Sequence, residues 1–472
     1  MQKTISHLLL IAFVQFGTWH LPAQNLESAT YLSNTPVTLL AGFSSDAKYN
    51  VDAYKIRYYT TDIDGSTTVV SGALLVPVNT PCDSFALGVY NHGTVLDRED
   101  VPSRDNFEAL VGKVMASTGA VAVAPDYLGL GDNPGLHPYL HGESEATATL
   151  DLIRAAREYL RDSLGVDLNG EVFVTGYSQG GHAAMATVKY VEDNNLFPEF
   201  NIIGAGPASG PYNLSSTMLP LLLSNTPYSN PGYIVYLLFA MERVYGNIYQ
   251  DYEDILDSPY DSLIPPLFDG TNTMAVVNNA LPNKIRDFLQ DTVIDNLIAD
   301  SVTQSHPIRL ALEDNDNYDW APSFPMELYY CTQDEQVDYQ NSLDAEAAMQ
   351  ARGANVTAVF RGNFNHGGCF LPSLGSALDF FQNLSTGCQS VSLAEMTESN
   401  IEVYPIPARD WVQVQGLAGR PIVVCDLHGN KVFEGPVPQN ELIDLSHCAP
   451  GVYLLKPVEQ VFSEAIKLVK AP

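Results

Sequence analysis

The residue best suited to act as a nucleophile in this sequence is Ser178, in the pentapeptide Gly-Tyr-Ser-Gln-Gly at residues 176–180. A short apolar run, residues 171–175, precedes this pentapeptide, and a run compatible with a helix, residues 182–188, follows it. In a Gly-x-Ser-x-Gly turn between a strand and a helix, the serine hydroxyl is presented above the edge of the sheet. The small flanking glycines permit the turn because they bring no Cβ clash. We therefore interpret Ser178 as a catalytic nucleophile.

A serine hydroxyl is a weak nucleophile unless a base takes its proton and an acid orients that base. In strand–turn–helix hydrolases the three residues follow in the order Ser, Asp or Glu, His. Asp334 comes just after an apolar run that ends at Cys331, and His366 comes just after the run at 356–360. Both are expected in loops at the carboxyl ends of strands. We predict a triad of Ser178, His366 and Asp334.

Other residues compete for the acid and base roles. Glu335 and Asp338 neighbour Asp334 and stay open as alternative acids, although each is also typical of a solvated loop or a helix start. His182 is expected on the helix after the serine, where it would point the wrong way for a base. The remaining candidates precede the serine or fall in a later insertion: His92, His137, His141 and His306.

The oxyanion that forms on attack at an acyl group needs two N–H donors already in position. One is expected to be the backbone N–H of Gln179, directly after the nucleophile. The other is expected from the segment Asn-His-Gly-Thr at residues 91–94, which follows a buried apolar run. We take Thr94 as the first choice for this donor and Gly93 as the second.

Apolar runs and helical patterns alternate through most of the chain, which predicts a parallel sheet with crossover helices. Two alternating runs in residues 53–78 flank a hairpin-like turn at 62–66. They are followed by strands at 86–90, 120–124, 171–175, 201–206, 326–331 and 356–360, and by helices at 107–117, 143–164 and 343–351. With the serine pentapeptide between one strand and its helix, this order predicts an α/β-hydrolase fold with a mainly parallel sheet, within residues 24–388.

The alternation breaks between about residues 211 and 325. This stretch is rich in Pro, Asn, Tyr and Leu, and it has helical fragments at 236–244 and 284–300. Insertions above the carboxyl ends of strands lie where α/β folds bind ligands. We predict a largely helical cap that contacts substrate.

Composition limits the possible partners. The 472 residues include 23 basic and 55 acidic side chains, for a formal net charge of −32. Because phosphate binding needs clustered Lys and Arg, nucleic acid is not expected as a partner. Residues 1–23, with Lys3 ahead of a short apolar run, predict a signal peptide, and no later run is long enough to span a bilayer. The chain is therefore expected to be secreted or at the cell surface.

Six cysteines are compatible with disulfides in an exported protein. Four of them, Cys82, Cys331, Cys369 and Cys388, lie in the predicted catalytic region, and Cys425 and Cys448 lie near the C-terminus. A bridge between the last two is the simplest guess, although six cysteines allow about 15 connectivities. No Cys or His cluster has zinc-site spacing. No metal or organic cofactor is expected.

One further segment is distinctive, Pro-Asp-Tyr-Leu-Gly-Leu-Gly at residues 125–131, followed by His-Pro-Tyr-Leu at 137–140. Together with Gly-Tyr-Ser-Gln-Gly-Gly and the late insertion, it resembles the secretory lipase family over about residues 50–385. The resemblance implies a capped serine hydrolase that acts on acyl esters. It also implies that Ser178, Asp334 and His366 match the nucleophile, acid and base of that family.

After a linker-like stretch at 389–400, residues 401–472 contain short alternating runs and Gly-Asn turns that predict a small β-sandwich. The motifs Gly-Val-Tyr-Leu-Leu-Lys at 451–456 and Lys-Leu-Val-Lys at 467–470 resemble the C-terminal sorting domain of bacterial type IX secretion. The usual Tyr-Pro-Asn-Pro is here Tyr-Pro-Ile-Pro, at residues 404–407. The resemblance implies the type IX secretion machinery as a partner. A carbohydrate-binding or adhesive module is the alternative.

These observations predict an exported serine esterase or lipase that cleaves small-molecule or lipid esters through an acyl-enzyme. A capped serine exopeptidase of the same fold stays open, because its catalytic residues would be identical. Such an enzyme needs a charged anchor for the peptide terminus, and the insertion offers Glu242, Asp254 and Glu313. A non-catalytic surface protein on this scaffold is a third possibility, in which Ser178→Ala would leave function intact.

Overall fold

The computed structural model describes residues 25–388 and most of residues 402–471, apart from 406, 416–417, 427–430 and 458–465. The chain divides into two compact units, residues 1–390 and 391–472. The expected signal peptide at 1–23 and the expected linker at 389–400 lie outside the described residues.

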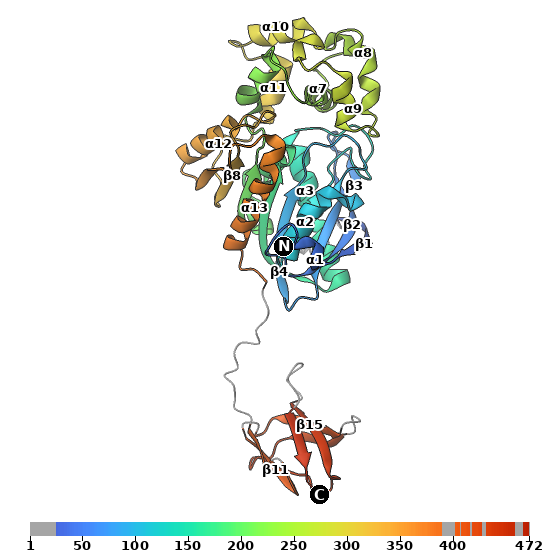
Figure 1. Cartoon of the computed structure of the whole chain (residues 1–472), viewed down its shortest axis with the longest axis vertical. Helices are drawn as coiled ribbons and strands as arrows, with labels where there is room; N and C mark the ends of the chain where they lie inside the picture. Colours follow the sequence, from blue (N-terminus) through green and yellow to red (C-terminus); the bar gives the residue numbers. More distant parts are fainter. Residues whose placement is uncertain are drawn as a thin grey trace, which may run out of the picture. The chain divides into compact units, whose positions relative to one another are not determined.

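The first unit is built around a nine-stranded sheet (Figure 1). In spatial order its strands are β1 (Leu26–Thr35), β2 (Asn50–Thr61), β3 (Thr67–Val78), β5 (Val121–Pro125), β4 (Ser84–Asn91), β6 (Asp167–Tyr177), β7 (Ile202–Ala208), β8 (Met326–Tyr330) and β9 (Val356–Phe360). The pairs β1–β2, β2–β3 and β3–β5 are antiparallel, and the other five pairs are parallel. The expected α/β-hydrolase sheet, mainly parallel, is confirmed.

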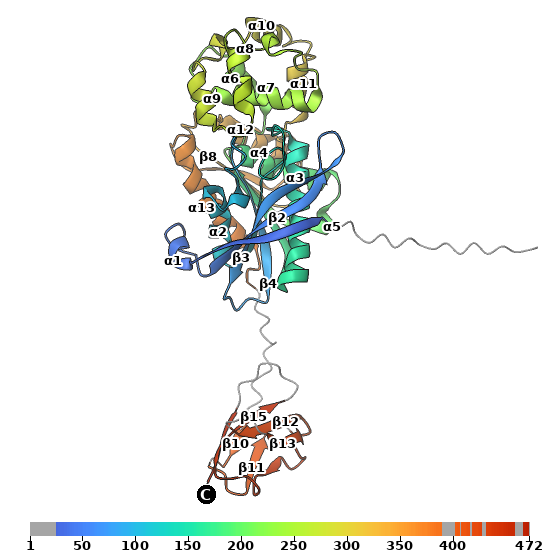
Figure 2. The ribbon, with the colours of Figure 1, turned by 90° about the vertical axis from the view of Figure 1, so that its right-hand side faces the viewer.

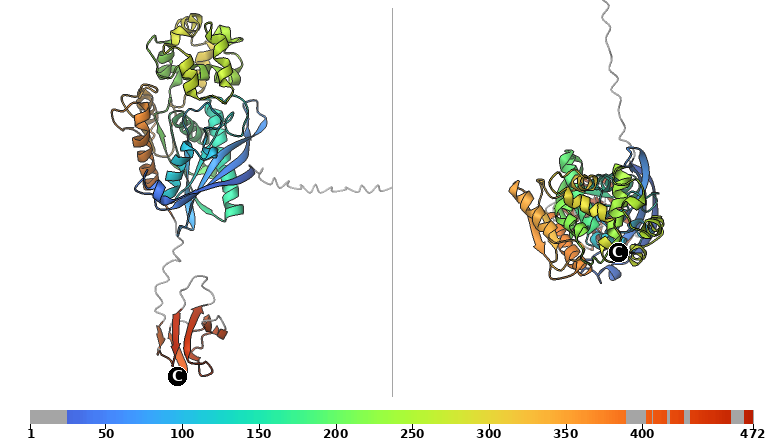
Figure 3. Two further views of the ribbon diagram at one scale, coloured as in Figure 1. Left: turned by 45° about the vertical axis from the view of Figure 1, so that its right-hand side comes forward. Right: turned by 90° about the horizontal axis from the view of Figure 1, so that it is seen from above.

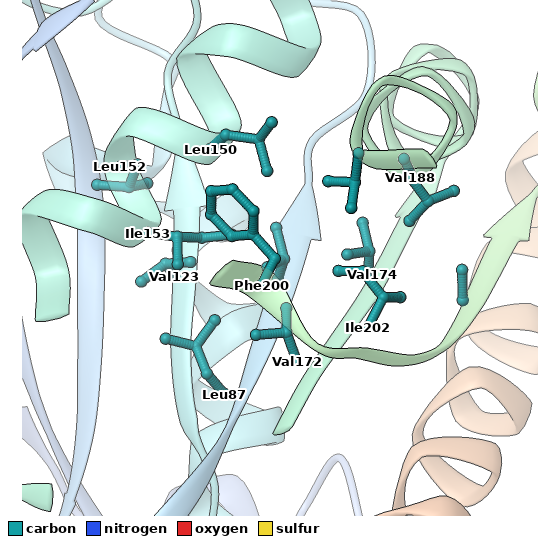
Figure 4. Close-up of a cluster of buried hydrophobic side chains, with 14 of the residues drawn as sticks. Leu87, Val123, Leu150, Leu152, Ile153, Val172, Val174, Val188, Phe200 and Ile202 are labelled. Atoms are coloured by element: carbon teal, nitrogen blue, oxygen red, sulfur yellow. The ribbon is translucent and has the colours of Figure 1, made fainter. Parts of the chain in front are cut away.

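Helices cover both faces of this sheet. The helices are α2 (Phe107–Ser117) and α13 (His366–Leu384) on one face, and α3 (Gly142–Tyr159), α4 (Gln179–Asp193) and α12 (Gln340–Ala351) on the other. Strand β6 shows how the faces are separated, because Val172 and Val174 pack with α3 and α4, whereas Phe173 packs with α2 and α13. Figure 4 shows the first of these clusters, which includes Val172 and Val174 of β6, Leu150 of α3 and Val188 of α4. The alternation of strand residues therefore produces two cores.

Sequence patterns located most of these elements. Helix α2 and strand β9 have the expected bounds, and Asn106 caps α2 by accepting a hydrogen bond from the N–H of Glu108. Strand β1 and helix α13 were not anticipated. In particular, His366 is the first residue of α13 rather than a loop residue, so the expectation of a loop there was wrong. The side chain of Asn365 supplies the N-cap by accepting the N–H of Gly368, so the helix begins at the base itself.

Residues 209–325, between β7 and β8, form the helical cap. Its α-helices are α6 (Leu219–Leu223), α7 (Gly232–Tyr245), α8 (Tyr260–Leu263), α9 (Met274–Ala280), α10 (Asp291–Ala299) and α11 (Pro307–Asp314). They gather at one end of the first unit in two views (Figures 2 and 3). The cap has its own apolar cluster, which includes Leu238, Phe288 and Leu297 and also takes in Leu96 and Tyr139 of the sheet's loops. The cap thus packs on the loops around the serine.

The second unit consists of two antiparallel sheets, which matches the expected small β-sandwich. One contains β10 (Glu402–Tyr404), β11 (Trp411–Gln415) and β14 (Leu442–Asp444); the other contains β13 (Lys431–Pro436), β12 (Pro421–Asp426), β15 (Gly451–Pro457) and β16 (Ile466–Lys470). Val412, Val424 and Leu455 belong to one buried cluster between them.

The expected bridge between Cys425 and Cys448 is not formed, and both cysteines are free. Cys448 packs in the same buried cluster as Val424. Because neighbouring strand residues point to opposite faces, Cys425 points away from the face on which Val424 lies. Cys425 also pairs with Leu454, which is more than a third exposed. The two thiols therefore lie on different sides of the sheet.

Within the part of the chain that the structure describes, no helix is both long enough and apolar enough to cross a membrane.

Candidate active site

Ser178 lies at the junction of β6 and α4, as the pentapeptide predicted. Its backbone has φ 60° and ψ −121°, a conformation that residues other than glycine rarely adopt. Its N–H donates to the carbonyl of Ala208 at the end of β7, at 2.9 Å. The flanking glycines are required here, since a methyl group on Gly176 would overlap the carbonyl of Gly180, and one on Gly180 would overlap the carbonyl of Asn91. The turn is held by contacts that leave no room for a Cβ.

The predicted base, His366, and the predicted acid, Asp334, are in contact. Nδ1 of His366 lies 2.8 and 2.9 Å from the two carboxylate oxygens of Asp334. Asp334 Oδ1 also accepts the N–H groups of Gln336 and Val337, at 3.0 and 2.9 Å. The side chains are 8% and 1% exposed, so water does not compete for this contact. Because a carboxylate can only accept, Nδ1 carries the proton and Nε2 of His366 is left as an acceptor.

The alternative acids take other positions. The carboxylate of Glu335 accepts the backbone N–H of His366 at 3.0 Å, and that of Asp338 accepts the N–H of Gln340 at 2.9 Å. Neither contacts the imidazole through a hydrogen bond in the described part of the chain. Asp334 is therefore the partner of His366.

One disulfide and one hydrogen bond hold His366 in place. The disulfide Cys331–Cys369 joins the end of β8, just before Asp334, to the first turn of α13. The hydroxyl of Tyr177 donates to the carbonyl of His366 at 2.5 Å, and the two rings lie 5.1 Å apart. The residue before Ser178 thus touches the predicted base. In the described part of the chain, the Ser178 hydroxyl itself makes no hydrogen bond to His366, a contact that often tightens only when substrate binds.

Both expected oxyanion donors lie in the segments around the serine. Within the described residues, the N–H groups of Thr94 and Gln179 donate no hydrogen bond, although Gln179 is buried. A Cβ built on Gly93 would lie 3.9 Å from the Cβ of Ser178, so this loop passes beside the nucleophile. Buried N–H groups without a partner are costly and uncommon. The N–H of buried Gln179, together with that of half-buried Thr94, is suited to a negatively charged oxygen.

A buried polar network anchors the side chain of Gln179. Its amide nitrogen lies 2.6 Å from Nε2 of His137 and 2.9 Å from the carboxylate of Glu145. The other carboxylate oxygen of Glu145 contacts Nδ1 of His182 at 2.7 Å, and Nε2 of His182 lies 3.0 Å from the carbonyl of Asn315, at the end of the cap. All these side chains are buried. The network joins α3, α4 and the cap.

The two histidines in this network have opposite pKa shifts. Burial lowers the pKa of His137 to about 3, so its ring is neutral. Its Nδ1 donates to the carbonyl of Leu128 at 2.8 Å, which leaves Nε2 to accept from Gln179. Burial also acts to lower the pKa of His182, but the charge of Glu145 and the hydrogen bonds to Glu145 and Asn315 outweigh it, and the pKa is raised.

Sequence reasoning missed these network residues. His137 and His182 were considered only as bases, and Glu145 was not considered. The one local signal was the segment at 137–140, which holds both His137 and Tyr139. Asp126, in the segment at 125–131, has a structural place, because its buried carboxylate accepts from the Ser71 hydroxyl and from the N–H of Ser103.

A cavity of about 60 Å³ opens on Ser178. The residues that line it are Tyr139, Leu140, Ser178, Gln179, Pro211, Leu214, Met218, Leu219, Leu221, Tyr228, Tyr233, Ile234, Leu237, Leu312, Gln336 and Val337. Most come from the cap, and none of these described lining residues is charged. The carboxylates that could have anchored a peptide terminus, Glu242, Asp254 and Glu313, are not among them. The site is suited to a neutral, mainly apolar group.

Comparison with known proteins identifies the family of the chain. A family model for secretory lipases matches residues 106–391, and one for the secretion system C-terminal sorting domain matches residues 402–471. The chain belongs to the secretory lipase family. It is therefore an exported hydrolase of the lipase and esterase type, secreted or at the cell surface.

Solved structures include similar proteins. The rice cell wall degrading esterase LipA from Xanthomonas oryzae is 31% identical, with a TM-score of 0.69, and the match covers 77% of this chain and 99% of that one. Two more distant structures share the fold. A protein from Legionella pneumophila has 24% identity, TM-score 0.71 and coverage of 77% and 98%, and lipase A from Candida antarctica has 17% identity, TM-score 0.54 and coverage of 77% and 84%. No curated protein matches the chain.

Proposed function

We propose that this chain is a serine carboxylic ester hydrolase that works through Ser178, His366 and Asp334. The observation that carries the proposal is the buried contact between Asp334 and Nδ1 of His366, which leaves Nε2 free to take a proton from the nearby serine. Family membership supports the same reaction class. So does the similarity to LipA, which is described as an esterase.

In the proposed mechanism, Oγ of Ser178 attacks the ester carbonyl while Nε2 of His366 takes its proton. The N–H groups of Thr94 and Gln179 donate to the oxyanion that forms. His366 then protonates the departing alcohol, and an acyl-enzyme remains on Ser178. Water, activated by the same base, releases the acid. Asp334 holds the imidazole in the required tautomer and stabilises its cation.

Esters are favoured over peptides as substrates because of the cavity. A serine exopeptidase must neutralise a charged peptide terminus, and a charge buried without a partner is costly. The lining residues of the cavity at Ser178 carry no charge. The helices between residues 211 and 325 would then act as a cap that encloses the acyl or alcohol group.

The test is hydrolysis of p-nitrophenyl esters of graded acyl length by the purified mature protein, beside Ser178→Ala. We expect hydrolysis by the wild type and a loss of at least about 10³-fold in kcat in the variant, because the nucleophile is gone. Peptide p-nitroanilides, assayed in parallel, should be poor substrates. Activity retained in Ser178→Ala, or hydrolysis of the anilides alone, would refute the proposal.

We further propose that residues 401–472 direct the chain to the type IX secretion machinery. The match of the sorting-domain model to residues 402–471 supports this. In a host with that machinery, deletion of residues 401–472 should leave the hydrolase inside the cell envelope, whereas the full chain reaches the medium or cell surface. Equal export of both forms would contradict the assignment.

A further inference from the structure

Tyr236, a buried side chain of helix α7 in the cap, contacts the loop at residues 91–96, the oxyanion loop. Its hydroxyl donates to the carbonyl of Val95 at 3.3 Å. Its ring stacks on Tyr139, with centroids 4.7 Å apart and planes within 7°. Tyr139 in turn shares a hydrogen bond of 3.0 Å between its hydroxyl and Oγ1 of Thr94. Tyr236 therefore acts on two consecutive residues of the loop, on Val95 directly and on Thr94 through Tyr139.

The same tyrosine also lies beside the second oxyanion segment. The ring of His137 meets the ring of Tyr236 edge to face, with centroids 6.1 Å apart. Nε2 of His137 accepts from the side chain of Gln179 at 2.6 Å. The N–H of Gln179 is the second expected oxyanion donor. Tyr236 is thus linked to Thr94 through the ring of Tyr139, and to Gln179 through the ring of His137.

We propose that Tyr236 and Tyr139 are positioning residues that transmit the placement of the cap to the two oxyanion N–H groups. The inference rests on the proposed ester hydrolysis. Its physical basis is that an oxyanion donor stabilises the transition state only when its N–H lies about 2.7–3.1 Å from the developing charge. Side chains that hold the loop at Thr94 and Val95 fix that distance. The cap then contributes to the chemical step as well as to enclosure of the substrate.

Two tyrosine variants separate this role from a packing role. Tyr139→Phe removes the hydroxyl that contacts Thr94 and keeps the ring stack, and Tyr236→Phe removes the hydroxyl that contacts Val95. Tyr58→Phe is the matched control, because it removes a buried hydroxyl that donates to a backbone carbonyl, that of Ala148, at 2.8 Å, and it lies on β2, outside the oxyanion loop and the cap. Tyr236→Leu also removes the ring stack.

We expect kcat to fall about 5- to 30-fold in each of the two Phe variants, a fraction of the ~10²- to 10³-fold effect of losing a donor outright. KM should change less than about twofold, because each Phe variant keeps the aromatic ring and loses only a hydroxyl that contacts the oxyanion loop. Inhibition by an alkyl boronic acid, which forms a tetrahedral anion on the serine, should weaken in parallel with kcat. Tyr236→Leu should lower kcat further, and Tyr58→Phe should match the wild type.

Each outcome decides a different point. If the wild type hydrolyses esters but Tyr139→Phe and Tyr236→Phe both match Tyr58→Phe in kcat and in boronic acid affinity, the positioning role is refuted while the proposed function stands. A rise in KM at constant kcat would refute it as well, since that pattern indicates lost substrate contacts. If the wild type hydrolyses no ester, or Ser178→Ala stays active, the proposed function fails and the inference fails with it. Thermal unfolding of each variant shows whether the fold is retained.

Discussion

The layer beneath Ser178 and the cap above it are built from different contacts. Beneath the serine, backbone atoms of β6, α4 and the loop at Asn91 approach so closely that Gly176 and Gly180 admit no Cβ. Buried hydrogen bonds to Glu145 and Asp334 fix the remaining geometry. In the cap, α7 and its neighbours pack through leucine, isoleucine and aromatic side chains.

This difference predicts how each region responds to change. A polar or backbone contact in the lower layer has one acceptable geometry, so an added or deleted group is expected to cost activity or stability directly. An apolar cluster tolerates changes in volume at modest cost. Changes to cap side chains other than Tyr236 should therefore alter which substrate fits, whereas changes beneath the serine should alter whether the reaction proceeds.

The largest effect is expected from Asp334→Asn. The amide keeps the size of the carboxylate but can donate to Nδ1 of His366, which favours the wrong tautomer and removes the charge that stabilises the cation. We expect kcat to fall about 10⁴-fold, with the melting temperature nearly unchanged. Steady-state kinetics on a p-nitrophenyl ester measure this. Asp338→Asn, in the same loop, is the control and should retain activity; a comparable loss there would show that the effect is not specific to the contact between Asp334 and His366.

The next largest effect is expected from Gly180→Ala. A methyl group would overlap the carbonyl of Asn91 and lie 2.7 Å from the carbonyl of His92. We expect a loss of at least about 3 kcal/mol in the free energy of unfolding, because neither backbone segment can move without breaking β4 or α4. Gly375→Ala in α13 is the control, since its added methyl meets no atom within 4 Å. It should be neutral or stabilising by about 1 kcal/mol. Equal stabilities in denaturant would show that the turn can relax.

The sequence was informative where structure depends on local pattern. Alternation located β2 and β3, and the pentapeptide identified the turn at Ser178, because both signals lie within a few consecutive residues. The order of motifs also selected Asp334 and His366, which the fold brings into contact.

Contacts between distant segments were not encoded in any such pattern. Gln179 and His137 are separated by 42 positions, and His182 and Asn315 by 133. No local periodicity relates them, so the network that holds Gln179 could not be foreseen. The pairing of Cys331 with Cys369 likewise depends on α13, whose start at His366 was missed. The guess of a Cys425–Cys448 bridge failed because it used proximity in sequence without the strand faces.

His137 should make the stability of the layer beneath Ser178 depend on pH. Its pKa is lowered to about 3 in the folded protein by burial, whereas in the unfolded chain it is about 6.5. Below pH 6.5 the unfolded chain therefore takes up a proton that the folded protein does not, and stability falls as pH decreases toward 3. Compared with His137→Gln, the wild type should lose about 1.4 kcal/mol more per pH unit between pH 6 and 4. Urea unfolding at several pH values measures the slopes; parallel slopes would show that His137 is protonated when folded.

The smallest effect, and the one that tests the cap directly, is expected from Leu237→Ala. Leu237 is on α7 and lines the cavity at Ser178, whose volume of about 60 Å³ suits a short acyl group. Removing its side-chain carbons should improve kcat/KM for hexanoate or octanoate relative to acetate by about 3- to 10-fold, since each buried CH₂ is worth about 0.8 kcal/mol. Leu263→Ala, an exposed leucine of the cap, should leave the ratio unchanged. If Leu237→Ala instead lowers kcat equally for every acyl length, the cap residue acts on the reaction rather than on selection. The contrast between the two layers would then be lost at that position.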